Sequence, residues 1–367
     1  MAGIIISKTT AGLNNGENAL IGKLAEPLKM YLTSESDAMA KKDGPAKWLC
    51  NAEPSDRFAE AGVVSARPSG LELTQDGDEA PLGERHETDK SVIYMLQYMR
   101  QEKIHASMVE DSMGKVSGEM KRTVRSLVND YYVTRNRLAG KMLTDATKIE
   151  TTFGKKRLTI AAPGGHPLFY KSHEIGSEGD VQSNIFYNTR GAGTDVDFSY
   201  IQNVMNDAVV RLSGIKASDG NVTGYTADTI VIPGDNAKLI TAVKKAVGSE
   251  LTDTSNGSSN GINIHAGNWN IIILNDWRPG SGRAPMIFLS SEARDELGGN
   301  MLYTRKKLTV ADWIENGTFN YCWAARARLG IGHHTYKHAL LFESLANGET
   351  ALYDGQTASA AATSVTL

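Results

Sequence analysis

The chain has 367 residues, which is more than one ordinary compact core holds, so we expect two domains or one elongated domain of several parts. It is 41% hydrophobic and 22% charged with a formal net charge of −3, which argues against a disordered chain and against a protein that coats nucleic acid over its whole surface. Two cysteines, Cys50 and Cys322, exclude a disulfide framework and predict buried, reduced thiols. No signal-like N-terminus and no run of roughly 18 apolar residues is present, so we expect a cytosol-like compartment and no membrane contact.

The first part of the chain, residues 1–61, gathers too few apolar residues to close a core. Short helical stretches such as Ala19–Tyr31 are interrupted by Asn, Gly and Pro. We therefore expect an arm that lies against another surface. Residues 62–90 hold turn-forming groups around a short alternating piece, Leu71–Thr74, which predicts a polar hairpin or a long extended loop.

A strand and a long helix follow. Ser91–Met99 is apolar at both alternating positions, a pattern typical of a strand buried on both faces. Ser117–Asp145 contains no proline and spaces its apolar residues by threes and fours, which predicts a helix of about eight turns, roughly 40 Å long. The apolar stripe consists of Met120, Val124, Leu127, Val128, Tyr131, Leu138 and Met142. The other side is basic, with Lys121, Arg122, Arg125, Arg135, Arg137 and Lys141 against Asp130. Such a helix would lie across one face of a thin domain.

The remaining chain alternates between helical and strand-like patterns. Phe153–Ala162 is strand-like, Gly164–Pro167 is a turn, and the polar, glycine-rich stretch Ser177–Thr194 predicts a surface loop. A mixed α/β region follows, with helices at Asp197–Leu212 and Asn236–Val247, strands at Thr229–Pro233, Asn270–Leu274 and Pro285–Ser290, and an exposed loop at Asp253–Asn260. Leu308–Ile314 and Gly317–Gly332 indicate two more strands, and the tail after Tyr353 is of low complexity.

The chain offers little chemistry. His333, His334 and His338 lie close in sequence, but no cysteine or nearby carboxylate completes a ligand set, so a solvated strand end explains them better than a metal site. The glycine pairs lack the spacing of a phosphate cradle, and no nucleophile elbow is present. Glu110 and Asp111 adjoin each other and would not face each other on a helix. We predict no catalytic, cofactor-binding or metal-binding residues. The basic helix side could meet polynucleotide phosphate, but a solvated face or a surface for a neighbouring subunit explains it better.

The order of these elements resembles a known family. The segment Leu82–Glu87 leads into the strand and Val109–Gly114 opens the basic helix, in a layout similar to the major capsid proteins of tailed double-stranded DNA phages, most of all the phage Mu head-subunit group. Further segments of this kind are Gly165–His173, Asp228–Pro233 and Trp313–Tyr321 with its continuation through Arg326 to Gly332. The resemblance covers roughly residues 82–342.

The resemblance implies an α+β protein of the HK97-like major capsid fold. Its expected parts are an N-terminal arm (1–61), an extended loop (62–90), a peripheral domain (91–199) with its spine helix at about 117–145, an axial domain (200–305), return strands of the peripheral domain (306–345) and a C-terminal tail (346–367). The side chains expected to contact neighbouring subunits are Arg67, Glu72, Asp76, Asp78, Glu84, Arg85, Arg122 and Arg125.

The implied function is self-assembly of hexamers and pentamers into an icosahedral shell. The shell would enclose phage double-stranded DNA with weak, non-specific contact, form in the host bacterial cytoplasm and become part of the virion. Portal, scaffolding and decoration proteins would be its partners. Two alternatives remain open: an encapsulin-type shell around a cargo protein, which has the same fold, and a soluble enzyme with its site in the α/β region. Imaging of purified particles for DNA or protein cargo separates the two shells.

Overall fold

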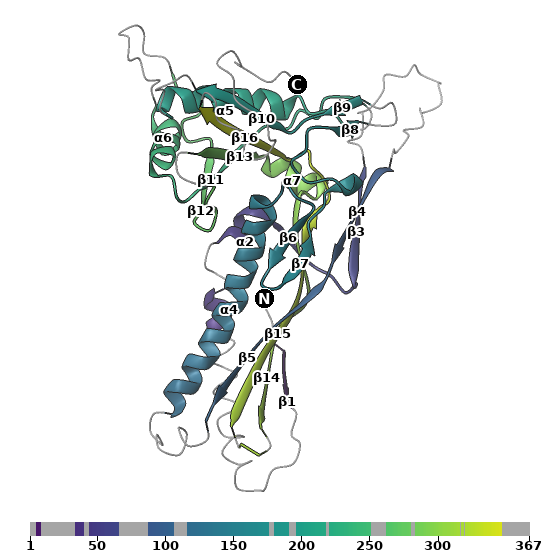
Figure 1. The fold of residues 1–367 in the computed structure, drawn as a ribbon, viewed down its shortest axis with the longest axis vertical. Coiled ribbons are helices and arrows are strands. Elements are labelled where there is room, and N and C mark those ends of the chain that lie inside the picture. The colour runs from purple at the N-terminus through teal and green to yellow at the C-terminus, as the bar shows by residue number, and fades with distance from the viewer. Residues whose placement is uncertain are drawn as a thin grey trace, which may run out of the picture. The chain divides into compact units, whose positions relative to one another are not determined.

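The structure is a computed structural model. It describes residues 5–8, 34–39, 44–65, 87–105, 116–175, 180–190, 196–217, 220–250, 262–279, 283–315, 317–318 and 320–346. The chain forms two compact units (Figure 1), of which unit 1 comprises Met1–Glu60, Tyr94–Ala139 and Leu302–Ile331, and unit 2 comprises Ala61–Ile93, Gly140–Met301 and Gly332–Leu367. The predictions for Ala19–Tyr31, Leu71–Thr74, Glu110 with Asp111, Asp253–Asn260 and the tail lie outside the described residues.

Unit 1 is built on a sheet whose strands come from distant parts of the chain. Its strand order is β1 (Ile5–Lys8), β14 (Asn300–Ile314), β15 (Tyr321–His333) and β5 (Leu96–Ile104), and β2 (Asn51–Pro54) also pairs with β14. β5 runs antiparallel to β15 along its whole length, whereas β1 is parallel to β14. The strands predicted near 308–314 and 317–332 are both confirmed, although the first begins earlier, at Asn300, and the second later, at Tyr321.

The long helix α4 (Val116–Thr144) is confirmed to within one residue at each end. Leu127 and Val128 are fully buried and pack with four residues of the sheet, Leu308, Val310, Trp323 and Ala325. Figure 1 shows α4 running alongside these strands. Tyr131 lies partly buried at the margin of the same cluster. At Leu127, Val128 and Tyr131 the apolar stripe predicted from the sequence is therefore the side of α4 that faces the sheet.

Unit 2 contains a second five-stranded sheet. Its order is β10 (Ile185–Arg190), β16 (Ala339–Ala346), β13 (Ala284–Leu289), β11 (Thr229–Pro233) and β12 (Asn270–Leu274). β13 is antiparallel to both β16 and β11, and the outer strands β10 and β12 run parallel to their neighbours. The strands predicted at 229–233, 270–274 and 285–290 are confirmed, and mixed helix and strand in both units agree with the α+β class.

Helices α5 (Phe198–Ser213) and α6 (Ala237–Gly248) pack on this sheet, as the sequence predicted. Each begins at a side chain that accepts a hydrogen bond from a free backbone N–H: Asp197 from Tyr200 at 2.8 Å and Asn236 from Leu239 at 3.0 Å. The apolar faces of both helices share one core with the sheet, in which the largest fully buried side chains include Ile201, Met205, Leu239, Phe288 and Phe342.

The surface loop predicted at Ser177–Thr194 is wrong for two of its segments. Asp180–Gln182 forms β9, which pairs with β8 (His173–Ile175), and residues 185–190 form β10 of the main sheet. The physical reason is Phe186, which is buried and packs against Phe342 with ring centroids 4.9 Å apart. A strand at the end of a sheet needs few apolar residues, so its pattern was weak in the sequence.

The single strand predicted at Phe153–Ala162 is a hairpin. β6 (Glu150–Phe153) pairs with β7 (Lys156–Thr159), and the chain turns at Gly154, whose φ of 64° favours glycine. The turn predicted at 164–167 is confirmed in part by a short 3₁₀ segment, Pro163–Gly165.

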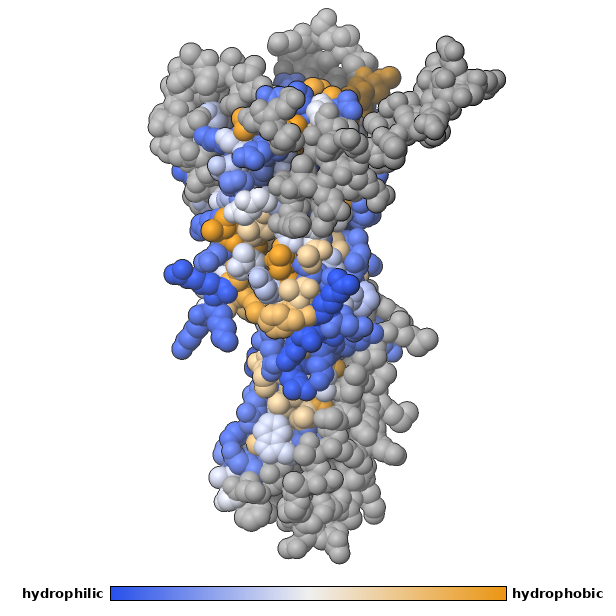
Figure 2. All heavy atoms as spheres, turned by 90° about the vertical axis from the view of Figure 1, so that its right-hand side faces the viewer, coloured by the Kyte–Doolittle hydropathy of each residue, from blue (hydrophilic) through white to orange (hydrophobic). Residues whose placement is uncertain are grey.

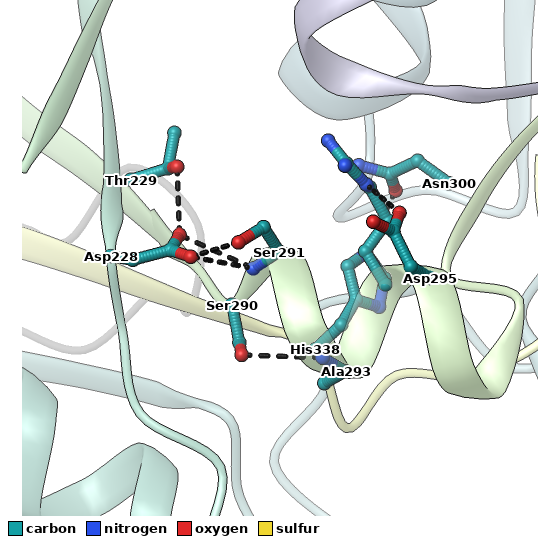
Figure 3. A network of polar contacts seen from close by, with 9 residues as sticks. Asp228, Thr229, Ser290, Ser291, Ala293, Asp295, Asn300 and His338 are labelled. Carbon is teal, nitrogen blue, oxygen red and sulfur yellow. Dashed lines mark hydrogen bonds and ion pairs between the residues drawn. The ribbon is translucent and has the colours of Figure 1, made fainter.

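A polar network fixes the start of α7 (Ser291–Leu297) next to the sheet of unit 2 (Figure 3). The carboxylate of Asp228 accepts hydrogen bonds from the backbone N–H of Ser291 at 3.2 Å, from the Ser291 hydroxyl and from the Thr229 hydroxyl at 2.8 Å. The Ser290 hydroxyl caps the helix by accepting from the N–H of Ala293 at 3.3 Å. These bonds satisfy helix N–H groups and position the residues that follow β13, so the network has a structural role.

The contact between α4 and the sheet predicts the effect of a charge at its centre. Leu127→Asp places an unpaired carboxylate in a fully buried apolar site and removes packing, so we expect a loss of about 3–5 kcal/mol in the free energy of unfolding and an insoluble or misfolded chain. Arg125→Glu is the matched control on the exposed side of the same helix, where an ion pair contributes about 0–1 kcal/mol. Solubility and thermal unfolding of both variants test this, and a soluble Leu127→Asp protein with unchanged melting temperature would contradict it.

Candidate assembly surfaces

A two-stranded ribbon flanks most of the segment 62–90, which the sequence predicts to be an extended loop. β3 (Ala59–Ser65) pairs with β4 (Glu87–Tyr94) as a separate two-stranded sheet, and residues 66–86 connect the two strands. A lone pair of strands is at best marginally stable in water. One side of this ribbon is covered within its own chain, where Ile93 is buried and the Ser91 hydroxyl is hydrogen-bonded to the His334 ring at 2.6 Å. The opposite, exposed side is the one that needs a further surface.

The strand segment that leads into the sheet of unit 1 exposes one apolar side, so the prediction that Ser91–Met99 is buried on both faces is wrong. The chain divides at Met95 into β4 and β5, and Ser91, Ile93 and Met95 are buried. The alternate side chains point outward: Val92 is 45% exposed and Tyr94 is 52% exposed. Apolar periodicity cannot distinguish a strand covered within its own chain from one whose second face is left for a partner.

An aromatic pair continues this exposed apolar side in unit 1. Phe58, 63% exposed, meets Tyr94 edge to face with ring centroids 6.3 Å apart, and the guanidinium of Arg305 lies 6.0 Å from the Phe58 ring. Exposed aromatic side chains of this size are typical of protein contact sites. Sequence reasoning missed Phe58 because it stands alone among polar residues, and no periodic pattern marked it.

Of residues 1–61, which the sequence predicts to be an arm, β1 and β2 pair with β14, and the segments around Ser36 and Ala46 contact α4 of the same chain. The Tyr132 hydroxyl donates to the backbone oxygen of Ser36 at 3.1 Å, and the side-chain oxygen of Asn136 accepts from the N–H of Ala46 at 3.2 Å, at the start of α2 (Pro45–Leu49). A Cβ atom at Gly44 would lie 2.7 Å from the Asn136 amide nitrogen, so a larger residue there would displace this side chain. The expectation that this region lies against another surface is met, in these residues, by its own chain.

The residues predicted to contact other subunits divide into two groups. Arg67, Glu72, Asp76, Asp78, Glu84 and Arg85 lie outside the described residues. Arg122 and Arg125 are both exposed on α4, and the Arg125 guanidinium lies 3.2 Å from the carboxylate of Glu35 in the arm. Arg125 therefore links helix and arm within one chain, and the role of both arginines between subunits stays a prediction.

The histidine cluster is buried, so the prediction of a solvated strand end is wrong. His333 and His338 both donate to the side-chain oxygen of Asn300, at 2.9 and 2.8 Å, and the His334 ring is hydrogen-bonded to the Ser91 hydroxyl at 2.6 Å. The residues between the histidines form the buried connection from β15 to β16, which the polar sequence did not reveal. Within the described ranges no three His, Cys, Asp or Glu residues could hold a metal ion.

Burial keeps several of these histidines neutral. It lowers the pKa of His333 to about 3 and the pKa of His338 well below its ordinary value. Burial also lowers the pKa of His173 to about 4; its ring stacks on Tyr336 with centroids 3.7 Å apart and donates to the oxygen of Leu168 at 3.1 Å. These rings hold unit 2 together as neutral hydrogen-bonding groups.

Two simpler predictions concern the cysteines and membrane contact. Cys50 and Cys322 are confirmed as free, buried thiols. In the part of the chain that the structure describes, no helix has the length and apolar character to cross a membrane.

Comparison with known proteins gives matches among solved structures. No protein-family model matches the chain, and no curated protein matches its sequence. The capsid of Myoviridae phage XM1 is similar at 13% identity and a TM-score of 0.43, over 81% of this chain and 89% of that one. The capsid of the native GTA particle is similar at 14% identity and a TM-score of 0.47, over 83% and 91%.

A virus-like particle from Pyrococcus furiosus is also similar, at 11% identity and a TM-score of 0.43, over 86% of this chain and 98% of that one. These similarities are distant, with identities of 11–14% and TM-scores below 0.5. The finer likeness to the phage Mu head-subunit group stays a prediction.

The buried histidines predict acid sensitivity. A histidine whose pKa is lower in the folded than in the unfolded chain stabilises the fold fully above about pH 6.5 and loses this contribution as pH falls toward the folded value. For His173 and His333, with pKa values of about 4 and about 3, the loss at pH 5 is about 2 kcal/mol each. The melting temperature should therefore fall steadily from pH 7 to pH 4.5.

His173→Gln tests the cause, since its amide can still donate to Leu168 but does not titrate. This variant should show a shallower fall in melting temperature, and His105→Gln, at the exposed end of β5, should behave as the unmodified chain. A melting temperature that is constant from pH 7 to pH 4.5, or an unchanged slope in His173→Gln, would refute the assignment.

Proposed function

We propose that this chain is a structural shell subunit with the HK97-like fold, the major capsid protein of a tailed double-stranded DNA phage. The observation that carries the proposal is the β3–β4 ribbon, a two-stranded element with the exposed apolar side chains Val92 and Tyr94. Such a ribbon gains stability when a neighbouring molecule covers it. A shell subunit meets neighbours on every side, so this requirement is satisfied throughout the assembly.

The neighbour is another copy of the chain. Identical subunits that meet through different patches form closed rings when the rotation closes, which is the principle of hexamers and pentamers. The loop between the two ribbon strands carries charges of both signs, Arg67, Glu72, Asp76, Asp78, Glu84 and Arg85, suited to many small polar contacts on an adjacent subunit. In this proposal residues 1–61 are the arm, 62–90 the extended loop, 91–199 and 306–345 the peripheral domain and 200–305 the axial domain.

The cargo is phage double-stranded DNA, held without tight binding. A shell that releases its genome must not bind it tightly. A net charge of −3 with scattered basic residues is consistent with such weak binding. Assembly takes place in the host bacterial cytoplasm, with portal, scaffolding and decoration proteins as further partners. The encapsulin-type alternative differs in its contents, so electron microscopy of purified particles that finds protein cargo and no DNA would favour it.

The loop predicts a separation of folding from assembly. Deleting Pro68–Pro81 removes the tip of the loop and leaves both ribbon strands, so the chain should stay soluble and folded but fail to form stable shells. Circular dichroism and thermal unfolding measure the fold, and negative-stain electron microscopy measures the shells. A variant with the same stretch replaced by glycine and serine at equal length keeps the chain length, so its failure would assign the contacts to the loop's side chains. Normal, equally heat-resistant particles from the deletion would disprove the proposed role of the loop.

Weak DNA contact is testable on isolated subunits. They should bind duplex DNA only at low ionic strength and release it as salt rises through the physiological range, because the binding depends on the release of counterions from phosphate. Fluorescence anisotropy with labelled duplexes of unrelated sequence measures this. Tight, sequence-selective binding that persists at physiological salt would point to a function other than a shell subunit.

A further inference from the structure

The sheet of unit 1 has two faces, and only one of them packs against α4. Side chains of a strand alternate between faces, so the residues of β15 that pack toward α4, Trp323 and Ala325, assign their neighbours to the other face. Arg326 and Arg328 therefore lie on the face away from α4. On β14 the same alternation places Lys307 on that face, because Leu308 packs toward α4.

The register between β5 and β15 extends this face across a third strand. Met99 lies opposite Arg326, Gln97 opposite Arg328 and Lys103 opposite Cys322. Gln97, Met99 and Lys103 are exposed. We call this surface the open sheet face and define it by Lys103, Lys307, Arg326 and Arg328. Figure 2 shows a group of hydrophilic side chains, in blue, just below the middle of the view, with weakly hydrophobic side chains beside it.

In β5, β14 and β15 the charged side chains are distributed unequally between the two faces. Glu102 lies opposite Trp323 and therefore on the α4 face, where it accepts from the Ser126 hydroxyl at 3.3 Å. Asp312 falls on that face too, by alternation from Val310, which packs toward α4. Among the described residues of β5, β14, β15 and their connecting hairpin, the open sheet face has one carboxylate, Glu315, and the Lys103 ammonium lies 2.5 Å from it. The other charged side chains that these strands give to the face are basic.

On α4, one of the cations is held by an ion pair, as Lys103 is on the open sheet face. The Arg125 guanidinium is paired with Glu35 at 3.2 Å, and Asp130 lies on the same helix, 2.9 Å from the Arg100 guanidinium. By contrast, the Arg328 guanidinium donates to a neutral group, the amide oxygen of Gln97, at 3.5 Å. Unit 1 thus has two basic surfaces, the basic side of the helix and the open sheet face.

We propose that the open sheet face binds the phosphate backbone of the enclosed duplex DNA. This inference rests on the proposed shell function and names the surface that meets the genome. Arginine, lysine and glutamine side chains donate hydrogen bonds to phosphate oxygens, and cations on neighbouring strands about 5 Å apart address several phosphates of one duplex. No pocket for a base edge is needed, so the contact is independent of sequence and sensitive to salt.

An acidic protein surface is the competing occupant, and the face suits it less. Protein contacts centre on clustered apolar anchors that exclude water. The exposed large apolar side chains of this face are Met99 on β5 and Trp313 on β14, and β15 lies between these strands. Such separated side chains do not make a continuous apolar centre.

The test measures duplex binding by the full-length chain against salt. For the double variant Arg326→Gln with Arg328→Gln, the slope of log K against log salt concentration should fall by about 2, because each arginine neutralises one phosphate. The matched control is Arg122→Gln with Arg125→Gln on α4, which removes two exposed cations from the same unit and should leave the slope unchanged. A reduced slope in the helix variant alone, or in neither variant, would overturn the inference.

Electron microscopy of the same preparations separates this inference from the shell proposal. The sheet variant should form shells like those of the unmodified chain, because its substitutions lie away from the ribbon. Normal shells together with an unchanged slope would refute the DNA-binding face and leave the shell function standing. Failure of the sheet variant to form shells would show that the face contacts another subunit, which also overturns the inference. An unmodified chain that forms no shells would refute the shell function itself.

Discussion

The packing of α4 against the sheet of unit 1 is the contact on which the rest of that unit depends. Leu127 and Val128 are buried against β14 and β15, strands that follow the helix by more than 150 residues in the sequence. The helix supports the described part of the arm in turn, through Tyr132 and Asn136. Without this packing, both the sheet face and the arm would lack support. An apolar contact between distant segments thus orders polar segments that have no core of their own.

The sheet of unit 1 combines stability and surface chemistry by simple alternation. Each strand gives one set of side chains to the α4 side and the other to the opposite face, where an exposed position such as Arg326 carries a charge without disturbing the packing. Arg326 and Ala325 are neighbours in sequence and differ completely in surroundings. Substitutions can therefore change the charge of one face, while the apolar packing of the other face continues to stabilise the fold. The exposed apolar side chains of β4 and β5 follow the same rule.

Sequence reasoning succeeded where a periodic pattern determined an element. The three-and-four spacing located α4, and helical patterns at 197–212 and 236–247 located α5 and α6. It failed where burial comes from distant partners. His333 and His338 look solvated in a polar stretch, but they are buried on Asn300. Strand β10 was missed because its burial rests on Phe186, which packs against Phe342 from a distant part of the chain. That the side chains of Val92 and Tyr94 are exposed could be recognised only in the structure. The alternation of side chains along β15 can be inferred from the sequence. Which of its two faces is not covered by α4 could be decided only from the position of the helix.

The discontinuous make-up of unit 1 sets the order of events during synthesis. A ribosome delivers residues from the N-terminus onward, and domains generally fold as units when their segments have emerged. The arm and α4 are made early, but Leu302–Ile331 must follow before the sheet exists and before α4 can pack against it. The sheet of unit 2 cannot be completed earlier either, since its last strand in the sequence, β16, lies between β10 and β13. A partly made chain therefore lacks the surfaces that would engage another copy, and association on the ribosome is delayed until nearly the whole chain has been released.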